Sequence, residues 1–375
     1  MTMQFDQDGG GITGITPAAL AGRRTGHSDW ACRFDAVWRK IGPTPAAFRK
    51  TFEANLGEHI DMLSRREYLK NSTLLAAACA LPAGLLQAFE NGDLITRVIP
   101  RSGEKLPIVG LGSSATFRQL AQRDDVSALK AVLETLVENG GTVFDTAPSY
   151  GASEEVAGRI ARESGLTDKI FWATKVNVAG RGGSSADIGR ARAQLAQSLA
   201  RIGKDPVDLI QVHNLADLAT QMPLIQELKE ECKIRYIGTT STRTSRYSDL
   251  EKAMRDYPLD FIGVNYAIDS RTAADRILPL AQELGIATLI YVPFGRSRLF
   301  SRVSGVQVPD WAKEFGADSW GKFFLKYIAS HPAVTCVTPA TSKPKNMLDN
   351  IGAAYGELPD ETTRNKMAQL IDDLP

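Results

Sequence analysis

From Leu106 onward, short apolar runs alternate with longer stretches whose apolar residues recur at helical spacing. Short apolar runs are typical of buried strands, and a period near 3.6 is typical of helices with one buried face. The expected strands are Ile108 to Leu111, Thr142 to Asp145, Ile170 to Lys175, Leu209 to His213, Tyr236 to Thr239, Phe261 to Asn265, Thr288 to Val292 and Thr335 to Thr338. The expected helices include Val126 to Glu138, Glu154 to Glu163, Ser185 to Ile202, Met222 to Glu231, Tyr247 to Asp256, Ala273 to Leu284 and Ser319 to Ser330.

Repeated strand–helix units predict an α/β protein built on a parallel sheet. Eight such units favour a closed (β/α)8 TIM barrel over an open doubly wound sheet. The sequence also lacks a GxGxxG motif opening a helix after the first strand, which weakens a dinucleotide-binding fold of the open type. In a closed barrel, the residues that do chemistry lie at the carboxyl ends of the strands.

Four polar residues fall at or just after the ends of three successive expected strands. Asp145 ends one strand and Tyr150 follows it, Lys175 ends the next, and His213 ends the third. Taken singly, such an Asp is commonly a turn or helix cap, such a Lys is commonly solvated, and such a His is often a satisfied core residue. Their coincidence on one rim of the barrel indicates a catalytic site.

Composition narrows the possible functions. The chain has 375 residues, 43% hydrophobic and 23% charged, and a formal net charge of +1, so it offers no broad basic surface for nucleic acid. The four cysteines show no CxxC and no short Cys/His spacing, which argues against a metal site and against a disulfide framework. A barrel fills about 250 residues, and residues 89–375 can supply it.

Residues 62–88 have the organisation of an export signal. Ser64-Arg-Arg-Glu-Tyr-Leu-Lys70 is cationic, an apolar run from Leu74 to Leu86 follows, and a small residue stands at Ala88. The run is shorter than the ~20 apolar residues that span a membrane, so a signal peptide is expected. The paired arginines resemble the twin-arginine signal, which exports folded proteins, here to the periplasm. An amphipathic helix carrying two arginines is the alternative.

Residues 1–61 precede this signal and show no sustained periodicity. We expect them to be non-native sequence from an over-extended gene start, with initiation at Met62, or else a disordered leader. Lipid attachment at Cys79 is an alternative to signal cleavage after Ala88. If the signal interpretation is wrong, the protein is cytoplasmic.

Four sequence motifs resemble the aldo/keto reductase family. They are FDTAPSYG, ATKV, LIQVHN and TPATSKPKNMLDNIGA, and the likeness runs from about Leu106 to Glu357. The resemblance implies a barrel that uses NADPH, or alternatively NADH, to reduce a small-molecule aldehyde or ketone. It also implies that Asp145, Tyr150, Lys175 and His213 form the catalytic tetrad of the family.

Each member of this tetrad has a physical role in reducing a carbonyl. Tyr150 can donate the proton to oxygen, and the ammonium of Lys175 is expected to make that phenol a better acid. Asp145 supplies the counter-charge to Lys175, and His213 can orient the carbonyl by a hydrogen bond.

The resemblance also implies a set of cofactor residues around the rim. Thr240, Ser241 and Asn265 match positions that hold the carboxamide. Tyr291 matches the aromatic residue that stacks on nicotinamide, with packing inside the barrel as the alternative. The stretch after the last strand contributes Ser342, Lys343, Asn346, Asp349 and Asn350 around the adenosine end. Asn346 stands where many relatives carry Arg or His, so the choice between NADP and NAD stays open.

Two other functions fit the same residues. The first is a cofactor-binding sensor or accessory subunit with slow or no turnover. The second is a lyase that uses Lys175 as a Schiff-base amine. Turnover of a carbonyl with NADPH distinguishes the reductase from both.

Overall fold

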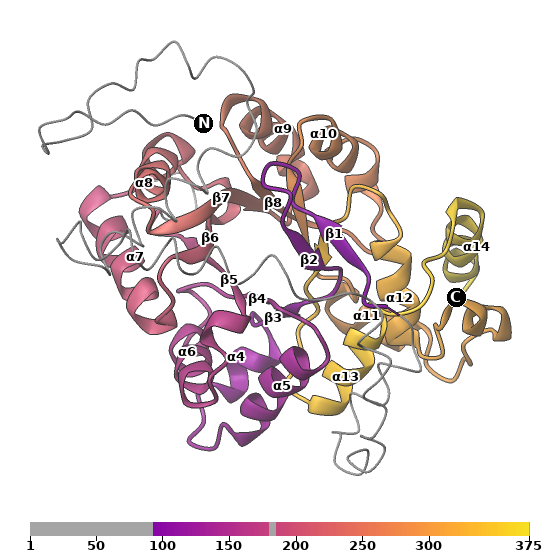
Figure 1. The fold of residues 1–375 in the computed structure, drawn as a ribbon. Coiled ribbons are helices and arrows are strands. Elements are labelled where there is room, and N and C mark those ends of the chain that lie inside the picture. Colours follow the sequence, from indigo (N-terminus) through magenta and orange to yellow (C-terminus); the bar gives the residue numbers. More distant parts are fainter. Residues whose placement is uncertain (1–92, 180–184, 375) are drawn as a thin grey trace, which may run out of the picture. The chain divides into compact units, whose positions relative to one another are not determined.

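The computed structural model describes residues 93–179 and 185–374 (Figure 1). The expectations for residues 1–61 and for the export signal at 62–88, including Cys79, lie outside the described residues. Within the described ranges, no helix is long and apolar enough to cross a membrane.

Eight parallel strands form the central sheet in the sequential order β3 to β10. They are β3 (Leu111–Gly112), β4 (Val143–Asp145), β5 (Phe171–Val176), β6 (Val207–Val212), β7 (Ile234–Ser241), β8 (Phe261–Asn265), β9 (Ala287–Tyr291) and β10 (Cys336–Val337). Isolated parallel bridges join Val109 to Val337 and Gly112 to Ala340, so the last strand meets the first. The expected (β/α)8 barrel is confirmed.

Helices surround the barrel and follow the strands in turn (Figure 1). The seven expected helices correspond to α5 (Ser127–Glu138), α6 (Ser153–Glu163), α7 (Ile188–Ile202), α8 (Leu218–Glu230), α9 (Tyr247–Asp256), α10 (Ile277–Glu283) and α12 (Trp320–Ala329). Helix α7 shows why the boundaries fall where they do. The Asp187 side chain accepts from the Arg190 amide at its start, and Gly203 adopts a left-handed φ of 73° at its end.

Four further helices were not expected from the sequence: α4 (Thr116–Leu120), α11 (Arg298–Arg302), α13 (Pro344–Gly352) and α14 (Glu361–Asp372). The stretch that contains α13 was expected only as a cofactor loop. Its Pro344 stands in the first turn, where a proline is favourable because its missing N–H would have no helical partner.

A β-hairpin that was not expected from the sequence covers the amino-terminal end of the barrel. It consists of β1 (Thr96–Val98) and β2 (Lys105–Pro107). Glu104, in its turn, accepts hydrogen bonds from Arg235 and from the Tyr236 hydroxyl at the start of β7. The hairpin is therefore tied to the barrel by charged and neutral donors at that end.

The barrel interior changes from apolar to polar along its axis. Alternate residues of a strand point to the same side, so Phe171, Ala173 and Lys175 succeed one another on the inside of β5. Phe171 packs with Tyr236 and Phe261 near the hairpin, in a buried apolar cluster that includes Ala173. Lys175 then lies at the opposite end. The carboxyl ends of the strands thus carry the polar layer.

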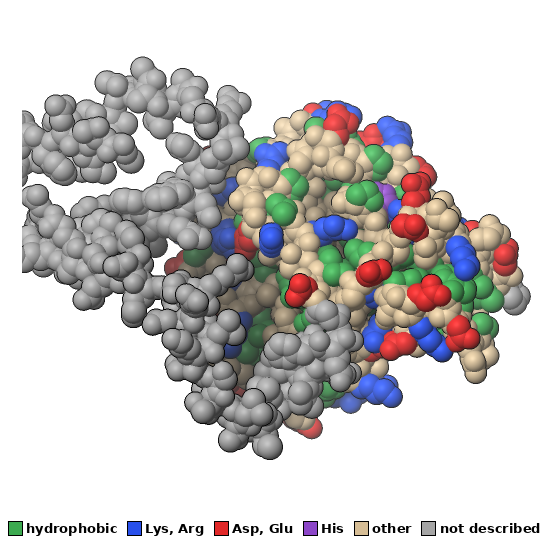
Figure 2. Space-filling model, turned by 45° about the vertical axis from the view of Figure 1, so that its right-hand side comes forward, with side chains coloured by type: hydrophobic (Ala, Val, Ile, Leu, Met, Phe, Trp, Pro, Cys, Tyr) green, Lys and Arg blue, Asp and Glu red, His purple; other side chains and the backbone are tan. Residues whose placement is uncertain are grey.

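On the face drawn in Figure 2, neither acidic nor basic side chains form a continuous patch. Acidic and basic side chains alternate there, with apolar side chains between them. This distribution agrees with the formal net charge of +1 of the whole chain.

Candidate active site

A buried ion pair forms the centre of the polar layer. Lys175 Nζ lies 2.8 Å from each carboxylate oxygen of Asp145 and 2.7 Å from the carbonyl oxygen of Thr146. Lys175 is 1% exposed and Asp145 is 3% exposed. The neighbouring strands β4 and β5 deliver the two residues, with Asp145 in register with Ala173. The ammonium therefore has all three of its N–H donors directed at oxygen atoms.

Tyr150 and His213 lie between this ion pair and the barrel mouth. Lys175 Nζ is 5.2 Å from the centre of the Tyr150 ring. The rings of Tyr150 and His213 meet edge to face with centroids 6.0 Å apart. Both side chains are partly exposed. The structure thus brings together the four residues expected to form the tetrad.

The backbone after His213 is bent sharply. Asn214, Leu215 and Asp217 all have positive φ values, at 58°, 56° and 41°. Non-glycine residues adopt this region rarely, and such conformations gather at functional sites. The Asn214 amide donates to Thr240 Oγ1 at 2.9 Å, which ties this turn to the end of β7.

Burial dominates the protonation behaviour of the ion pair. Burial raises the pKa of Asp145, while the ammonium of Lys175 and the hydroxyl of Tyr291 act in the opposite direction. Burial alone would lower the pKa of Lys175, but the Asp145 charge and Tyr150 raise it above its ordinary value. Lys175 is therefore a protonated amine at neutral pH.

The expected effect of Lys175 on Tyr150 is present, but it is smaller than the effect of burial. Desolvation raises the pKa of Tyr150, Lys175 lowers it, and Asp145 raises it again. Lys175 thus acts in the expected direction, but burial outweighs it and the pKa of Tyr150 lies above that of a free phenol. The neutral hydroxyl holds its proton at neutral pH, which is the form that a proton donor needs.

Two residues on other strands complete the polar layer. The Tyr291 hydroxyl, at the end of β9, donates to Asp145 Oδ1 at 2.9 Å and accepts from Gln211 Nε2 at 3.1 Å. From the sequence, Tyr291 was expected to stack on the cofactor or to pack inside the barrel, and Gln211 was not singled out. Gln211 lies on β6 two residues after Leu209, which belongs to the interior cluster, so strand alternation alone places Gln211 on the inner face.

The expected carboxamide residues lie at the ends of β7 and β8. Thr240 and Ser241 are buried. Thr240 accepts from the Asn214 amide, and the Ser241 hydroxyl donates to the Arg243 carbonyl at 3.4 Å. Asn265 accepts from the Tyr247 hydroxyl at 3.0 Å and is partly exposed.

The expected adenosine-end residues lie on and before α13. Lys343 and Asn346 are exposed, Ser342 and Asp349 are partly exposed, and Asn350 is buried. Asp349 accepts from Ser319 at the start of α12 at 2.8 Å, so this carboxylate faces the neighbouring helix. Of the five expected residues, Lys343 and Asn346 are therefore the most accessible to a ligand.

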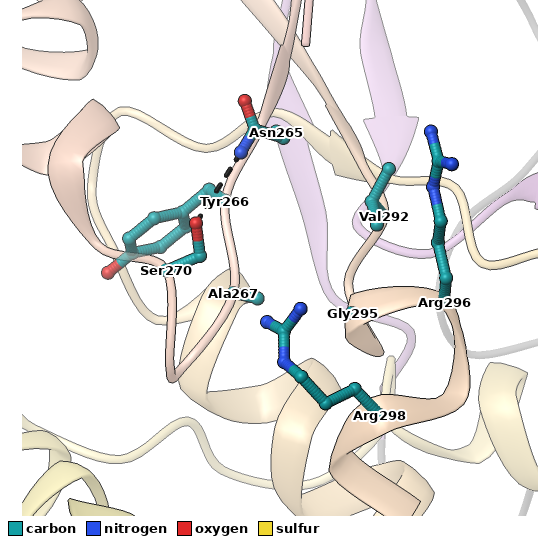
Figure 3. Close-up of a pocket in the computed structure, with 8 residues that line it drawn as sticks. All are labelled: Asn265, Tyr266, Ala267, Ser270, Val292, Gly295, Arg296 and Arg298. Carbon is teal, nitrogen blue, oxygen red and sulfur yellow. Dashed lines mark hydrogen bonds between the residues drawn. The ribbon is translucent and has the colours of Figure 1, made fainter. Parts of the chain in front are cut away.

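A small cavity opens at the ends of β8 and β9 (Figure 3). Its volume is about 120 Å³, and its lining comprises Asn265, Tyr266, Ala267, Ser270, Val292, Gly295, Arg296 and Arg298. Asn265 is the one that was singled out from the sequence as a site residue. Both arginines lie in the segment that follows the carboxyl end of β9, and that position, rather than the residue type, is the signal that could have pointed to them.

The two arginines of the cavity are held differently. Arg298 pairs with Asp269 at 2.8 Å and lies close over Gly295. Arg296 is exposed and forms no ion pair with any described residue. Its φ of 57°, like the 55° of the β-branched Val292, belongs to the left-handed region and costs of order 1–3 kcal/mol. The backbone after β9 is thus held in an unfavourable conformation where it forms the cavity wall.

Among residues 93–179 and 185–374, no group of three or more His, Cys, Asp or Glu side chains is placed to hold a metal ion.

The fold and this polar layer define a (β/α)8 enzyme with a Lys–Asp pair beneath a tyrosine. The family model described as "Aldo/keto reductase family" matches residues 108–368, which is most of the chain. The chain belongs to the aldo/keto reductase family and is an oxidoreductase of that family.

Individual relatives agree with this assignment. Aldo-keto reductase str7 of Strobilurus tenacellus is 26% identical over 287 residues, covering 68% of this chain and 83% of that protein. Aldo-keto reductase YhdN of Bacillus subtilis is 28% identical over 214 residues, and the match covers 55% of this chain and 64% of YhdN.

Solved structures show the same fold at lower identity. Aldo-keto reductase AKR11C1 of Bacillus halodurans in its holo form has a TM-score of 0.60 at 21% identity, covering 74% of this chain and 96% of that one. An aldo-keto reductase of Klebsiella pneumoniae in complex with NADPH has a TM-score of 0.56 at 22% identity, covering 75% of this chain and 95% of that one.

Proposed function

We propose that this protein reduces aldehyde or ketone carbonyls to alcohols with NADPH, and that Tyr150 is the proton donor. The observation that carries the proposal is the buried Lys175–Asp145 pair beneath the Tyr150 ring. Full burial of a charged pair is costly and is uncommon without a functional reason. A purely structural role for the pair would not explain why Tyr150 and His213 gather at the same mouth.

The residues around the mouth fit a nicotinamide dinucleotide. Arg296 offers an exposed cation beside a polar cavity, which suits the diphosphate of such a ligand. Asn265, Thr240 and Ser241 offer amide and hydroxyl groups, and Lys343 offers a second exposed cation before α13. When bound, the reduced nicotinamide supplies the hydride to the carbonyl carbon. NADPH is the proposed cofactor, with NADH as the alternative.

The protein's own residues manage the proton and the substrate. Tyr150 donates its hydroxyl proton to the carbonyl oxygen as the alkoxide forms there. Lys175 and Asp145 then stabilise the tyrosinate that is left, because the ammonium lies beside it and its own counter-charge is fixed. His213, whose ring meets that of Tyr150 edge to face, orients the carbonyl by a hydrogen bond. A proton from solvent restores Tyr150 after the alcohol leaves.

The alternatives meet specific difficulties in this geometry. A Schiff-base lyase needs Lys175 as a free amine, but its ammonium donates to three oxygen atoms and its pKa is raised. A sensor that binds the cofactor without turnover has no need of a proton donor over that ion pair. Incubating the purified full chain with NADPH and an aromatic aldehyde tests the proposal. Steady loss of the absorbance of the reduced nicotinamide is expected, whereas binding of NADPH without any loss would favour the sensor.

We also propose that the protein is exported folded to the periplasm by the twin-arginine machinery. The motif at Ser64 to Lys70 and the apolar run after it support this address. Fractionating cells and sequencing the mature amino terminus tests it. A chain beginning near Phe89 in the periplasm is expected, and an intact Met1 in the cytoplasm would overturn both the address and the proposed start at Met62.

A further inference from the structure

The side chain of Tyr291 crosses the barrel mouth to reach Asp145, which lies 146 residues earlier in the chain. Its hydroxyl is 2.9 Å from Asp145 Oδ1 and 3.1 Å from Gln211 Nε2. The direction of both bonds follows from chemistry. An ionised carboxylate only accepts, so the phenolic proton lies toward Asp145, and the lone pair of the same oxygen accepts the amide N–H of Gln211.

The absence of a side chain at residue 263 makes this arrangement possible. A β-carbon built on Gly263 would lie 2.3 Å from Tyr291 Cε2 and 2.7 Å from its hydroxyl oxygen. Real contacts of a β-carbon are essentially never that short, so any larger residue on β8 would displace the ring. Gly263 sits beside Leu289 in the β8–β9 register, two residues before Tyr291. The glycine at position 263 therefore leaves the space that the Tyr291 ring fills.

We propose that Tyr291 is a positioning residue of the reductase site, which fixes the Asp145 carboxylate and is itself oriented by Gln211. This inference rests on the proposed reductase function. Asp145 Oδ1 receives a hydrogen bond from both Lys175 and Tyr291, so the carboxylate is held from two strands, β5 and β9. Gln211 Oε1 has no hydrogen-bond partner among the described residues, which leaves the bond to Tyr291 as the one that orients this amide.

The role follows from the burial of Asp145. A buried carboxylate that loses a donor is less stable as an anion, and it takes up a proton at higher pH. Lys175 would then lose its counter-charge, and the stabilisation of the Tyr150 anion would be lost with it. The titratable groups that face Asp145 are Lys175 of β5, Tyr150 after β4, Tyr291 of β9 and Cys336 of β10, with His213 beyond Tyr150.

The decisive variant is Tyr291→Phe, which removes the hydroxyl and keeps the ring. We expect kcat to fall about tenfold, as for loss of one hydrogen bond to a charged group. The affinity for NADPH should change by less than about twofold, because the ring surface remains. The acid limb of the rate profile should move up by about one pH unit, because Asp145 protonates more easily.

Tyr236→Phe is the matched control. Tyr236 is another tyrosine inside the barrel whose hydroxyl donates to a carboxylate, that of Glu104, but it lies at the hairpin end. The Tyr236→Phe variant should have the same kcat and the same pH profile as the parent. A profile of Tyr291→Phe that coincides with that of Tyr236→Phe would overturn the proposal.

Gly263→Ala supplies a second, independent approach. It should lower kcat by a similar factor, and combining it with Tyr291→Phe should cost little more, because both changes remove the same contact. Additive losses would argue against the proposal. If Gly263→Ala does not fold, the comparison of the two tyrosine variants still decides the question.

A readout without turnover separates this inference from the proposed function. The Asp145 carboxyl carbon can be followed by NMR titration of protein labelled with 13C-aspartate, and the signal missing in Asp145→Asn identifies it. Its midpoint should rise in Tyr291→Phe but not in Tyr236→Phe. An inactive parent would contradict the reductase function, whereas an unshifted midpoint would contradict the role of Tyr291.

Discussion

Lys175 and Asp145 form an ion pair that uses both carboxylate oxygens at 2.8 Å and is almost completely withdrawn from water. Breaking such a pair leaves an uncompensated buried charge. We expect Lys175→Met to lower the free energy of unfolding by about 3–5 kcal/mol, and the double change with Asp145→Asn to restore a large part of that loss. Urea unfolding of the three proteins measures the difference.

An exposed pair provides the control for this experiment. Lys252 and Asp256 are 2.7 Å apart on the surface of α9. Lys252→Met should leave the free energy of unfolding almost unchanged, because solvent screens the pair. If Lys175→Met lowers the free energy of unfolding no more than Lys252→Met does, the buried ion pair does not stabilise the fold as expected.

Tyr150→Phe should abolish most of the reductase activity. Removing a general acid typically costs about 10²–10⁴-fold in rate, while the remaining ring keeps the edge-to-face contact with His213. The rate of NADPH oxidation with an aldehyde measures the loss. Tyr355→Phe, which removes a hydroxyl bonded to the Asn139 carbonyl far from the mouth, should turn over at the rate of the parent.

Arg296→Ala should weaken NADPH binding without reaching the tetrad. Loss of one charge-assisted contact to an anion corresponds to about a tenfold increase in Kd. Fluorescence titration of the bound nicotinamide measures Kd directly. Arg255→Ala removes another exposed arginine, from α9, and should leave Kd unchanged. Equal effects of the two variants would mean that Arg296 contributes only to the general charge of the protein.

The lowered pKa of His331 predicts that the protein loses stability in mild acid. Burial, with Arg364 acting in the same direction, lowers its pKa to about 4, and its Nδ1 accepts the Ala333 amide at 3.2 Å. The unfolded chain binds a proton near the ordinary pKa of about 6.5, so the unfolded state holds more protons between these two values. Stability should therefore be full above about pH 6.5 and decline as the pH falls toward 4.

Substitution of His331 tests whether this residue causes the pH dependence of stability. In His331→Gln, the unfolding midpoint in urea should vary less between neutral pH and about pH 4.5 than it does in the parent. An identical pH dependence in both proteins would show that the loss arises from other groups.

Strand ends were the most predictable part of the site. Asp145, Lys175 and His213 end or follow apolar runs, and in a parallel barrel all carboxyl ends meet at one rim, so their proximity follows from topology. The contact between Tyr291 and Asp145 was not predictable in this way. It depends on the reach of one side chain across the barrel and on the space above Gly263, and neither is encoded in local periodicity.

The amino-terminal hairpin was missed for a different reason. Each of its strands has three residues, too short for alternation to be recognised, and its stability comes from distant partners such as Arg235. Arg296 was not singled out because its position depends on a turn with positive φ, and an arginine in the sequence does not indicate such a turn.

The hairpin affects how molecules enter and leave the barrel. It covers one end of the barrel, and Phe171, Tyr236 and Phe261 fill the layer above it, so the interior is a cup with a single mouth. In the proposed reaction, the substrate, the alcohol and the protons that restore Tyr150 all use that mouth. Lys175 lies at the bottom of this route with its three donors directed at oxygen atoms, so in the proposed mechanism the protons that restore Tyr150 arrive from the mouth rather than through the lysine.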